Sequence, residues 1–495
     1  MNVTRRVLIV AGGRGAATVS VFVVNALLAR AWDLQTFGRF SAVWILGNAL
    51  APVFQQGIPS ALLYFFPRHD SRGRRRLLGM AGASLLLAAA VFALVLSLAG
   101  PALAPILGLE QTLTSGLIVS FLPYAFCLVA AGQTDSALIA AGAPVMQATI
   151  GGAHALSLIA VAGYACQVGL AVEEVLQLAS ITGLARLGVC YLTLILIIGV
   201  PLGSAAQEWR SFFRYAWTIG TGDAMGSLSR NVDRAVVLSL FGAGSLGLYH
   251  VGAIEVPVSL LLSAVVAVVL PEVSRLAAEG EHTRVVRLFR RAVGQLAMLI
   301  IPLFCYLFVF AENIFAVYLP KAFAESENVF RLFLLALPLR CAIYNPSLVG
   351  LGHAGWALKG ALFDLVTNVV LSIVFVVVLL DHAPELALYG PAAATVTATY
   401  LQVVALVIAT SIALGSSVRA MLPGRRLLRT AGVAVVSAFT VSVLLQSWQT
   451  HALTVVAISA GGFSLLYCGG LSLFAAERKE LQQVWHSVMQ GSHRG

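Results

Sequence analysis

Apolar segments of about 20 residues recur along the whole chain, separated by short polar stretches. A helix of that length crosses a hydrocarbon layer of ~30 Å and satisfies its own backbone hydrogen bonds there. Runs such as VVLSIVFVVVLL do not alternate, which excludes the strands of a transmembrane barrel. The pattern predicts an all-α, polytopic membrane protein with about 14 transmembrane helices. These lie at residues 7–30, 40–65, 78–99, 113–140, 145–167, 175–200, 213–241, 246–270, 292–313, 328–350, 356–380, 388–413, 429–447 and 453–475.

The composition supports this prediction and argues against an enzyme. Hydrophobic residues make up 59% of the chain and charged residues 11%, whereas soluble domains average about 25% charged residues. The connections are short and leave no room for a soluble catalytic domain. The chain lacks GxxxxGK[ST], HExxH, GxSxG and clustered Cys or His residues. The glycines of VLIVAGGRGAAT are out of place for a dinucleotide fingerprint, so we expect neither a metal nor a cofactor.

Basic residues gather on one side of the predicted helices. If the N-terminus is cytoplasmic, stretches such as SRGRRR (71–76) and RVVRLFRR (284–291) lie inside, while Arg30, Arg39 and Lys321 lie outside. This is the positive-inside pattern, and it predicts that both termini are cytoplasmic. It also explains most of the net charge of +10, so we do not expect a nucleic-acid partner.

Two parts of the chain look like copies of each other. FGRF at 37–40 matches LGLY at 246–249, and the basic stretches 72–76 and 284–291 repeat at about the same offset of ~210 residues. Copies with the same orientation predict two six-helix lobes around a central cavity. We assign residues 1–200 to the first lobe and 201–414 to the second. Residues 415–476 are two extra helices, and 477–495 form a cytoplasmic tail.

Arginines inside predicted spans are the first candidate site, because intramembrane charges are costly and usually functional. RNVDR (230–234) places two arginines one turn apart with Asp233 beside them, and we expect Asp233 to neutralise Arg234. Guanidinium groups grip anions with several oxygens, such as pyrophosphate. The candidate substrate-binding residues are Arg14, Arg30, Arg230, Arg234 and Arg340. A further aromatic and amide set suits either sugar rings or ordinary helix packing: Tyr124, Gln133, Tyr344, Asn345 and Gln402.

A second candidate site combines carboxylate, amide and hydroxyl oxygens. Asp364 and Asn368 are one turn apart in the eleventh span, and Thr395 and Thr399 are one turn apart in the twelfth. Asp223 in the seventh span lies at a similar predicted depth. These groups suit coupling to Na⁺ or H⁺; the alternative is hydrogen bonding between helices without an ion.

Three stretches carry a resemblance to a known family. ARAWDLQTFGRFS, NVDRAVVLSLFGAGSLGLYHV and FDLVTNVVLSIVFVVVLL, the last followed by YGPAAATVTATYLQ, resemble segments of the polysaccharide transporter (O-antigen flippase) family. That family belongs to the multidrug/oligosaccharidyl-lipid/polysaccharide (MOP) exporter superfamily. The resemblance implies a flippase of the bacterial inner membrane. Such a protein moves undecaprenyl-pyrophosphate-linked oligosaccharide from the cytoplasmic to the periplasmic leaflet for O-antigen, capsule or exopolysaccharide synthesis, alongside polysaccharide polymerase and export proteins.

Several alternatives remain open. The chain is also similar to lipid II flippases, which have cavity arginines in the first span and a sodium site on spans 7, 11 and 12. Here Asp364 precedes Asn368, the reverse of their order, so a proton could replace sodium. A multidrug exporter of the same superfamily is a further alternative. So are an O-antigen polymerase or lipid-linked glycosyltransferase, whose long periplasmic loop is missing here, and a scaffold within an export complex.

Overall fold

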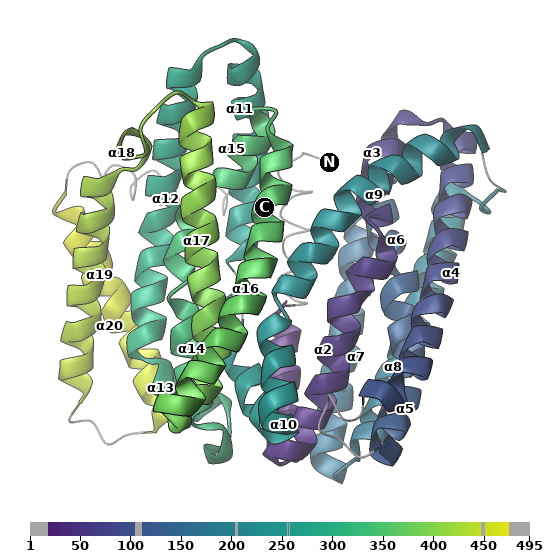
Figure 1. The fold of residues 1–495 in the computed structure, drawn as a ribbon, viewed down its shortest axis with the longest axis horizontal. Coiled ribbons are helices and arrows are strands. Elements are labelled where there is room, and N and C mark those ends of the chain that lie inside the picture. Colours follow the sequence, from purple (N-terminus) through teal and green to yellow (C-terminus); the bar gives the residue numbers. More distant parts are fainter. Residues whose placement is uncertain are drawn as a thin grey trace, which may run out of the picture. The chain divides into compact units, whose positions relative to one another are not determined.

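The computed structural model describes residues 18–103, 111–202, 206–254, 256, 258–446 and 451–474. Over these residues all regular elements are helices (Figure 1). Twelve segments are long and apolar enough to cross a membrane. The predicted all-α, multi-span fold is therefore confirmed, while the number of fourteen spans is not. The segments are Leu34–Gln55, Ser71–Ala99, Ser115–Ala140, Pro144–Val168, Val172–Ile198, Trp209–Gly252, His282–Val309, Ser326–Gly350, Gly355–His382, Pro384–Ala413, Gly424–Leu445 and Ala452–Ser472.

The first predicted span and the boundary between spans 7 and 8 account for much of the difference in number. The first span, 7–30, lies partly outside the described residues, and its described part is a shorter apolar helix, Thr18–Ala31. Trp209–Gly252 is counted as one segment of 44 residues. It consists of α9 (Ala206–Ser229) and α10 (Val232–Gly252), and α10 is interrupted at Gly242, where φ is 80° and ψ is −179°. Only glycine adopts this backbone conformation readily.

The interruption in α10 folds the chain back on itself. The Tyr249 hydroxyl donates to Asp233, 16 positions earlier, over 3.0 Å. In a straight helix these residues would lie about 24 Å apart. The two halves of α10 therefore form a hairpin that turns at Gly242, between the predicted spans 213–241 and 246–270.

The chain forms two compact units. The first contains residues 1–264 and 358–402, and the second contains 265–357 and 403–495. The predicted lobe boundaries at 200, 414 and 476 stay a prediction. Besides α9 and α10, the first unit contains α2 (Leu34–Gln55), α3 (Ile58–Phe65), η1 (Phe66–Arg68), α4 (Ser71–Leu103), α5 (Gln111–Ala130), α6 (Gly132–Ala140), α7 (Pro144–Val168), α8 (Val172–Ile198) and η4 (Pro384–Tyr389). A unit boundary falls within each of α11 (Ser259–Ala278), α16 (Ala354–His382) and α17 (Gly390–Ala413).

In the first unit α2 packs closely against α10 (Figure 1). A Cβ added to Gly38 would lie 1.7 Å from the Ala243 carbonyl oxygen, and one added to Gly247 would lie 2.5 Å from the Leu34 carbonyl oxygen and 3.1 Å from the Gly38 nitrogen. Small residues allow helices in a membrane to approach this closely. Gly38 and Gly247 are equivalent positions of the predicted repeat, and segments related by a two-fold axis meet at equivalent residues.

Asp33 fixes the start of α2 outside the membrane-spanning segment. Its side chain accepts a hydrogen bond from the Thr36 backbone nitrogen at 3.0 Å. Hydrogen bonding to Thr36 lowers the pKa of Asp33, because it stabilises the ionised carboxylate. The cap thus satisfies a backbone donor in the first turn of α2, one turn before Gly38.

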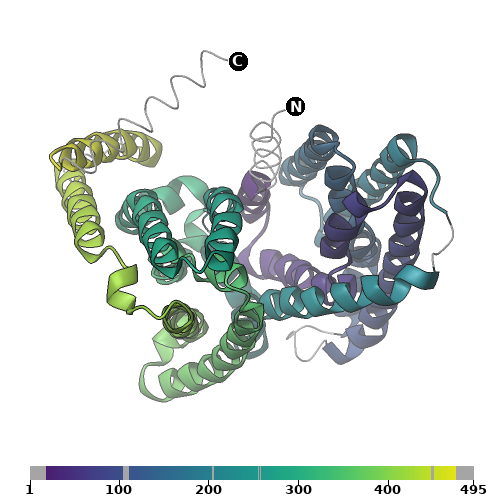
Figure 2. The ribbon, with the colours of Figure 1, turned by 90° about the horizontal axis from the view of Figure 1, so that it is seen from above.

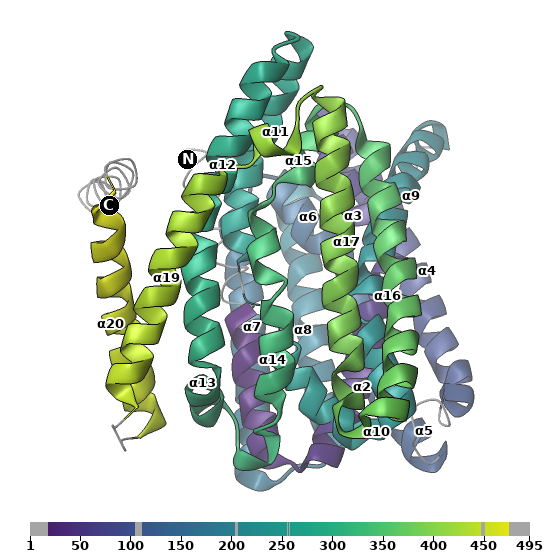
Figure 3. The same cartoon turned by 60° about the vertical axis from the view of Figure 1, so that its left-hand side comes forward.

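In the second unit the last two helices pack against α12 (His282–Val309). The helices α19 (Gly424–Leu445) and α20 (Ala452–Ser472) lie side by side, as the two yellow ribbons in Figures 2 and 3 show. The remaining helices of this unit are α13 (Ala311–Tyr318), η2 (Lys321–Phe323), α14 (Ser326–Leu334), η3 (Leu337–Cys341), α15 (Tyr344–Gly350) and α18 (Val418–Met421).

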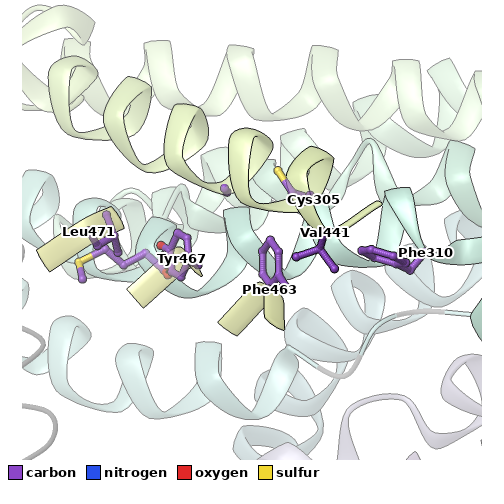
Figure 4. Close-up of a cluster of buried hydrophobic side chains, with 9 residues drawn as sticks. Cys305, Phe310, Val441, Phe463, Tyr467 and Leu471 are labelled. Carbon is purple, nitrogen blue, oxygen red and sulfur yellow. Dashed lines mark hydrogen bonds between the residues drawn. The ribbon is translucent and has the colours of Figure 1, made fainter. Parts of the chain in front are cut away.

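A buried cluster holds α12, α19 and α20 together (Figure 4). The rings of Phe463 and Tyr467 stack with centroids 6.0 Å apart. The Tyr467 hydroxyl donates to the Met298 carbonyl over 2.8 Å, and the Tyr306 hydroxyl donates to the Val456 carbonyl over 3.1 Å. The residues predicted to be extra helices are thus an integral part of the second unit.

Candidate functional site

A hydrogen-bonded network joins the end of α9 to α16 and α17. The Ser229 hydroxyl donates to Asp364 over 2.6 Å, and the Asn368 amide donates to the Ser229 carbonyl over 3.0 Å. The amide oxygen of Asn368 accepts from Thr395 at 3.0 Å and from Ser372 at 3.2 Å. Three of the residues predicted to couple an ion, Asp364, Asn368 and Thr395, therefore lie in one network.

The sequence explains why these side chains meet. Asp364, Asn368 and Ser372 follow each other at single helical turns, so they project from one face of α16. The last carbonyl groups of a helix have no partner within it. Because α9 ends at Ser229, the Ser229 carbonyl accepts a hydrogen bond from the Asn368 amide instead.

The network supplies several oxygen atoms for an ion. Asn368 is only 1% exposed and Ser229 only 3% exposed, so water has little access to them. The carboxylate of Asp364, the amide oxygen of Asn368 and the Thr395 hydroxyl are the kinds of group that bind Na⁺ or relay a proton. Both lone pairs of the Asn368 oxygen already accept hydrogen bonds, from the hydroxyls of Ser372 and Thr395. A cation that binds this oxygen would have to displace those hydrogen bonds.

The side chains of the other two predicted ion-coupling residues make different contacts. Thr399 donates to the Thr395 carbonyl of its own helix over 2.9 Å. Asp223 is exposed and lies within electrostatic reach of Arg230, two turns further along. Their coupling role stays a prediction.

The segment RNVDR (230–234) contains a buried ion pair, Asp233 with Arg234, and an exposed arginine, Arg230. Asp233 is fully buried and pairs with Arg234, with 3.7 Å between Oδ1 and Nη1, which confirms the predicted pair. Arg234 also donates to the carbonyl groups of Ala253 and Arg230. The bond to Ala253 and the Tyr249 hydroxyl hold the two halves of α10 together. Arg230 lies at the break between α9 and α10 and is exposed, so it remains accessible to an anion.

The remaining predicted arginines are distributed along the chain. Arg14 lies outside the described residues. Arg30 is exposed at the end of the helix over residues 18–31 and donates to the Ala26 carbonyl over 3.1 Å. Arg340 is exposed in η3 of the second unit. A common anion site formed by these arginines with Arg230 stays a prediction.

The structure also contains an intramembrane ion pair that sequence reasoning did not predict. Arg186 of α8 donates to Asp135 of α6 over 2.8 Å. The His154 ring of α7 lies within electrostatic reach of both and stacks on Tyr124 with centroids 6.5 Å apart. The paired residues are 51 positions apart, so no helical spacing signals the contact. In contrast, Arg331 pairs with Glu327 one turn away over 3.1 Å, a spacing that the sequence shows directly.

Part of the proposed sugar-binding set takes part in packing. Gln133 donates to the Tyr191 hydroxyl over 2.7 Å, and Gln402 donates to the Gly360 carbonyl over 3.0 Å. Tyr124 is 5% exposed. These contacts favour the packing interpretation for Gln133, Gln402 and Tyr124.

Comparisons with known proteins agree with this architecture. The chain is similar to a structure titled lipid II flippase MurJ in an inward closed conformation, with TM-score 0.73, 15% identity, and coverage of 94% of this chain and 99% of that one. It is also similar to an inward-facing multidrug resistance MATE family transporter of the MOP superfamily, with TM-score 0.64, 15% identity, and coverage of 84% and 95%. A MOP superfamily transporter from Pyrococcus furiosus gives TM-score 0.62, 13% identity, and coverage of 83% and 95%.

The sequence itself carries the family assignment. No curated protein matches it. A family model described as polysaccharide biosynthesis protein matches residues 27–328, which is more than half of the chain. At identities this low the structural matches show the fold alone, and they confirm the predicted resemblance to the MOP exporter superfamily. The chain belongs to the polysaccharide biosynthesis protein family and has the fold of the MOP exporters.

Proposed function

We propose that this protein is a flippase that moves undecaprenyl-pyrophosphate-linked oligosaccharide from the cytoplasmic to the periplasmic leaflet by alternating access. One observation carries the proposal: a chain of the polysaccharide biosynthesis family has the fold of a lipid II flippase. Polysaccharide synthesis on a lipid carrier requires that the polar head group cross the membrane. The product would be O-antigen, capsule or exopolysaccharide.

Arg230 is the residue best placed to contact the pyrophosphate. It is exposed, whereas the neighbouring Arg234 is only 14% exposed and is already bonded to Asp233 and two carbonyl groups. A guanidinium binds phosphate oxygens in a bidentate manner, and an ionisable residue within a membrane-spanning segment is a functional candidate by default. Arg14, Arg30, Arg234 and Arg340 stay the other predicted anion-binding residues.

The network around Asn368 is the proposed coupling site for Na⁺ or H⁺. It is linked to α9 through Ser229, the residue directly before Arg230. A cation that takes the oxygens of Asp364 and Asn368 would compete with the Ser229 hydroxyl for the Asp364 carboxylate and so alter the position of Arg230. Asp223 and Thr399 would assist from neighbouring turns.

We further propose that the protein lies in the bacterial inner membrane with both termini in the cytoplasm. The one-sided distribution of arginines supports this orientation. Polysaccharide polymerase and export proteins are the expected partners, because a flipped oligosaccharide must be joined to a growing chain. The short connections between spans support a transporter rather than an enzyme.

A reconstituted flipping assay tests the proposal. Proteoliposomes would contain a fluorescent undecaprenyl-pyrophosphate oligosaccharide, and its exposure in the outer leaflet would be followed with wild type and Arg230→Ala. We expect the variant to flip at least about tenfold more slowly, the effect of losing about 1.4 kcal/mol of a charge-assisted bond.

The control is Arg275→Ala, because Arg275 is exposed but already paired with Glu272 and Glu279 at 2.6 and 2.8 Å. Equal loss in both variants would refute the role of Arg230. Folded wild type that does not flip the lipid would refute the proposed function, and export of cationic drugs by the same vesicles would then indicate a multidrug exporter.

A further inference from the structure

The second unit carries an exposed group of arginines that the fold assembles from two distant segments. Arg290 of α12 donates to the Ala420 carbonyl of α18 over 3.5 Å, although the two residues are 130 positions apart. Arg426 of α19 contacts the Met298 sulfur of α12 at 2.7 Å. The first half of α12 therefore lies beside α18, and the start of α19 lies beside the middle of α12. We call the exposed residues at this place the arginine face: Arg287, Arg290, Arg291, Arg419, Arg425 and Arg429.

Nearby carboxylates do not neutralise the arginine face. Glu272 and Glu279 both pair with Arg275, at 2.6 and 2.8 Å. Glu281 pairs with Arg284 at 3.6 Å. Within the part of the chain that the structure describes, the arginine face forms no ion pair with a carboxylate. It therefore presents a positive surface that suits an anionic partner.

The position of the arginine face along α19 points to lipid. Leu428, which lies between Arg425 and Arg429, is 75% exposed. Two to three turns further, Val435, Val436 and Phe439 are 56%, 65% and 69% exposed, as expected of a surface that contacts hydrocarbon. A helix rises 1.5 Å per residue, so Arg429 and Arg425 precede Val435 by about 9 and about 15 Å along α19. They therefore lie on the side of the apolar surface where a headgroup layer begins, which extends about 5–7 Å beyond the hydrocarbon.

We propose that the arginine face binds the headgroups of anionic phospholipids in the cytoplasmic leaflet. Guanidinium groups form bidentate bonds with phosphate, and clusters of several arginines directly beside a membrane-spanning helix bind anionic lipids. The charges belong to α12, α18 and α19, so this binding would give the C-terminal helices of the second unit a role in holding the protein in an anionic leaflet. The inference depends on the predicted orientation in the membrane and not on flipping activity.

Spin-labelled lipids measure this preference directly. The full-length protein would be reconstituted in phosphatidylcholine vesicles with a trace of spin-labelled phosphatidylglycerol or phosphatidylcholine. Electron paramagnetic resonance gives the relative association constant of the two lipids. The test variant removes four charges of the arginine face: Arg287→Gln, Arg291→Gln, Arg419→Gln and Arg425→Gln. The control removes two exposed arginines of the second unit that carboxylates already neutralise: Arg275→Gln and Arg284→Gln.

We expect wild type to prefer phosphatidylglycerol. The test variant should lower the relative association constant by at least about fivefold, the factor for one arginine at a lipid surface, and the control should lower it less than about twofold. Equal losses in both variants, or no preference in wild type, would overturn the proposal. So would a preference for undecaprenyl pyrophosphate without one for phosphatidylglycerol. Thermal unfolding checks that both variants are folded; if the test variant is not, Arg287→Gln with Arg419→Gln replaces it under the same criterion of about fivefold.

Discussion

Gly38→Ala tests the close contact between α2 and α10. The added Cβ would lie 1.7 Å from the Ala243 carbonyl oxygen, whereas carbon and oxygen normally approach to about 3.3 Å. Since the obstacle is backbone, no side chain can turn away, and the helices must separate by more than about 1 Å. Overpacking of this kind costs up to about 3 kcal/mol. Alanine in place of glycine in a helix returns about 1 kcal/mol, so we expect a net loss of about 2 kcal/mol.

The assay is unfolding of the purified protein by denaturant, followed by tryptophan fluorescence. Gly163→Ala in α7 is the matched control, because a Cβ there meets no atom within 4 Å, and we expect it to be neutral or slightly stabilising. Gly247→Ala should resemble Gly38→Ala, and the double variant should be less than additive because both open the same contact. If Gly38→Ala unfolded at the same denaturant concentration as wild type, α2 and α10 would not approach as closely as described.

Two further predictions concern charges inside the membrane-spanning helices. Tyr249→Phe removes a hydrogen bond from the fully buried Asp233, and we expect a loss of about 1–3 kcal/mol in the same unfolding assay. Arg186→Gln leaves Asp135 without its partner; because the Asp135 side chain is 38% exposed, we expect about 1–2 kcal/mol, less than for a fully buried pair. Adding Asp135→Asn to Arg186→Gln should recover most of that loss. A double variant as unstable as the single one would contradict the ion pair.

Features that depend on local spacing could be predicted from the sequence. Apolar runs of sufficient length gave the helical membrane fold, because a helix is the way for a single segment to satisfy its backbone in lipid. The pair of Asp233 and Arg234 follows from their adjacency. The break between the seventh and eighth spans was expected between residues 241 and 246, and the structure places it at Gly242.

Features that depend on packing between distant helices could not be predicted. Ser229 looks like an ordinary polar residue near the end of a span, and its contact with Asp364 exists because α9 and α16 lie together. The pair of Asp135 and Arg186 likewise joins two different helices, and no helical repeat relates residues 51 positions apart. Neither contact has a local signal, so the identity of the residues alone could not reveal them.

The hydrogen-bonded network around Asn368 reaches Ser229, the residue directly before the exposed Arg230. Coupling between cation binding and substrate binding can therefore be tested. Ser229 bonds to Asp364 and Asn368, and Arg230 follows it directly. If a cation at the network shifts the position of Arg230, linkage requires that the substrate change cation affinity by the same factor as the cation changes substrate affinity. Binding of undecaprenyl pyrophosphate, measured with and without Na⁺ and at two pH values, gives that factor. Asn368→Ala should abolish the dependence while leaving binding itself intact. Dependence that survives in Asn368→Ala would place the coupling ion elsewhere, whereas wild-type binding without any dependence would show that the network only packs α9 against α16.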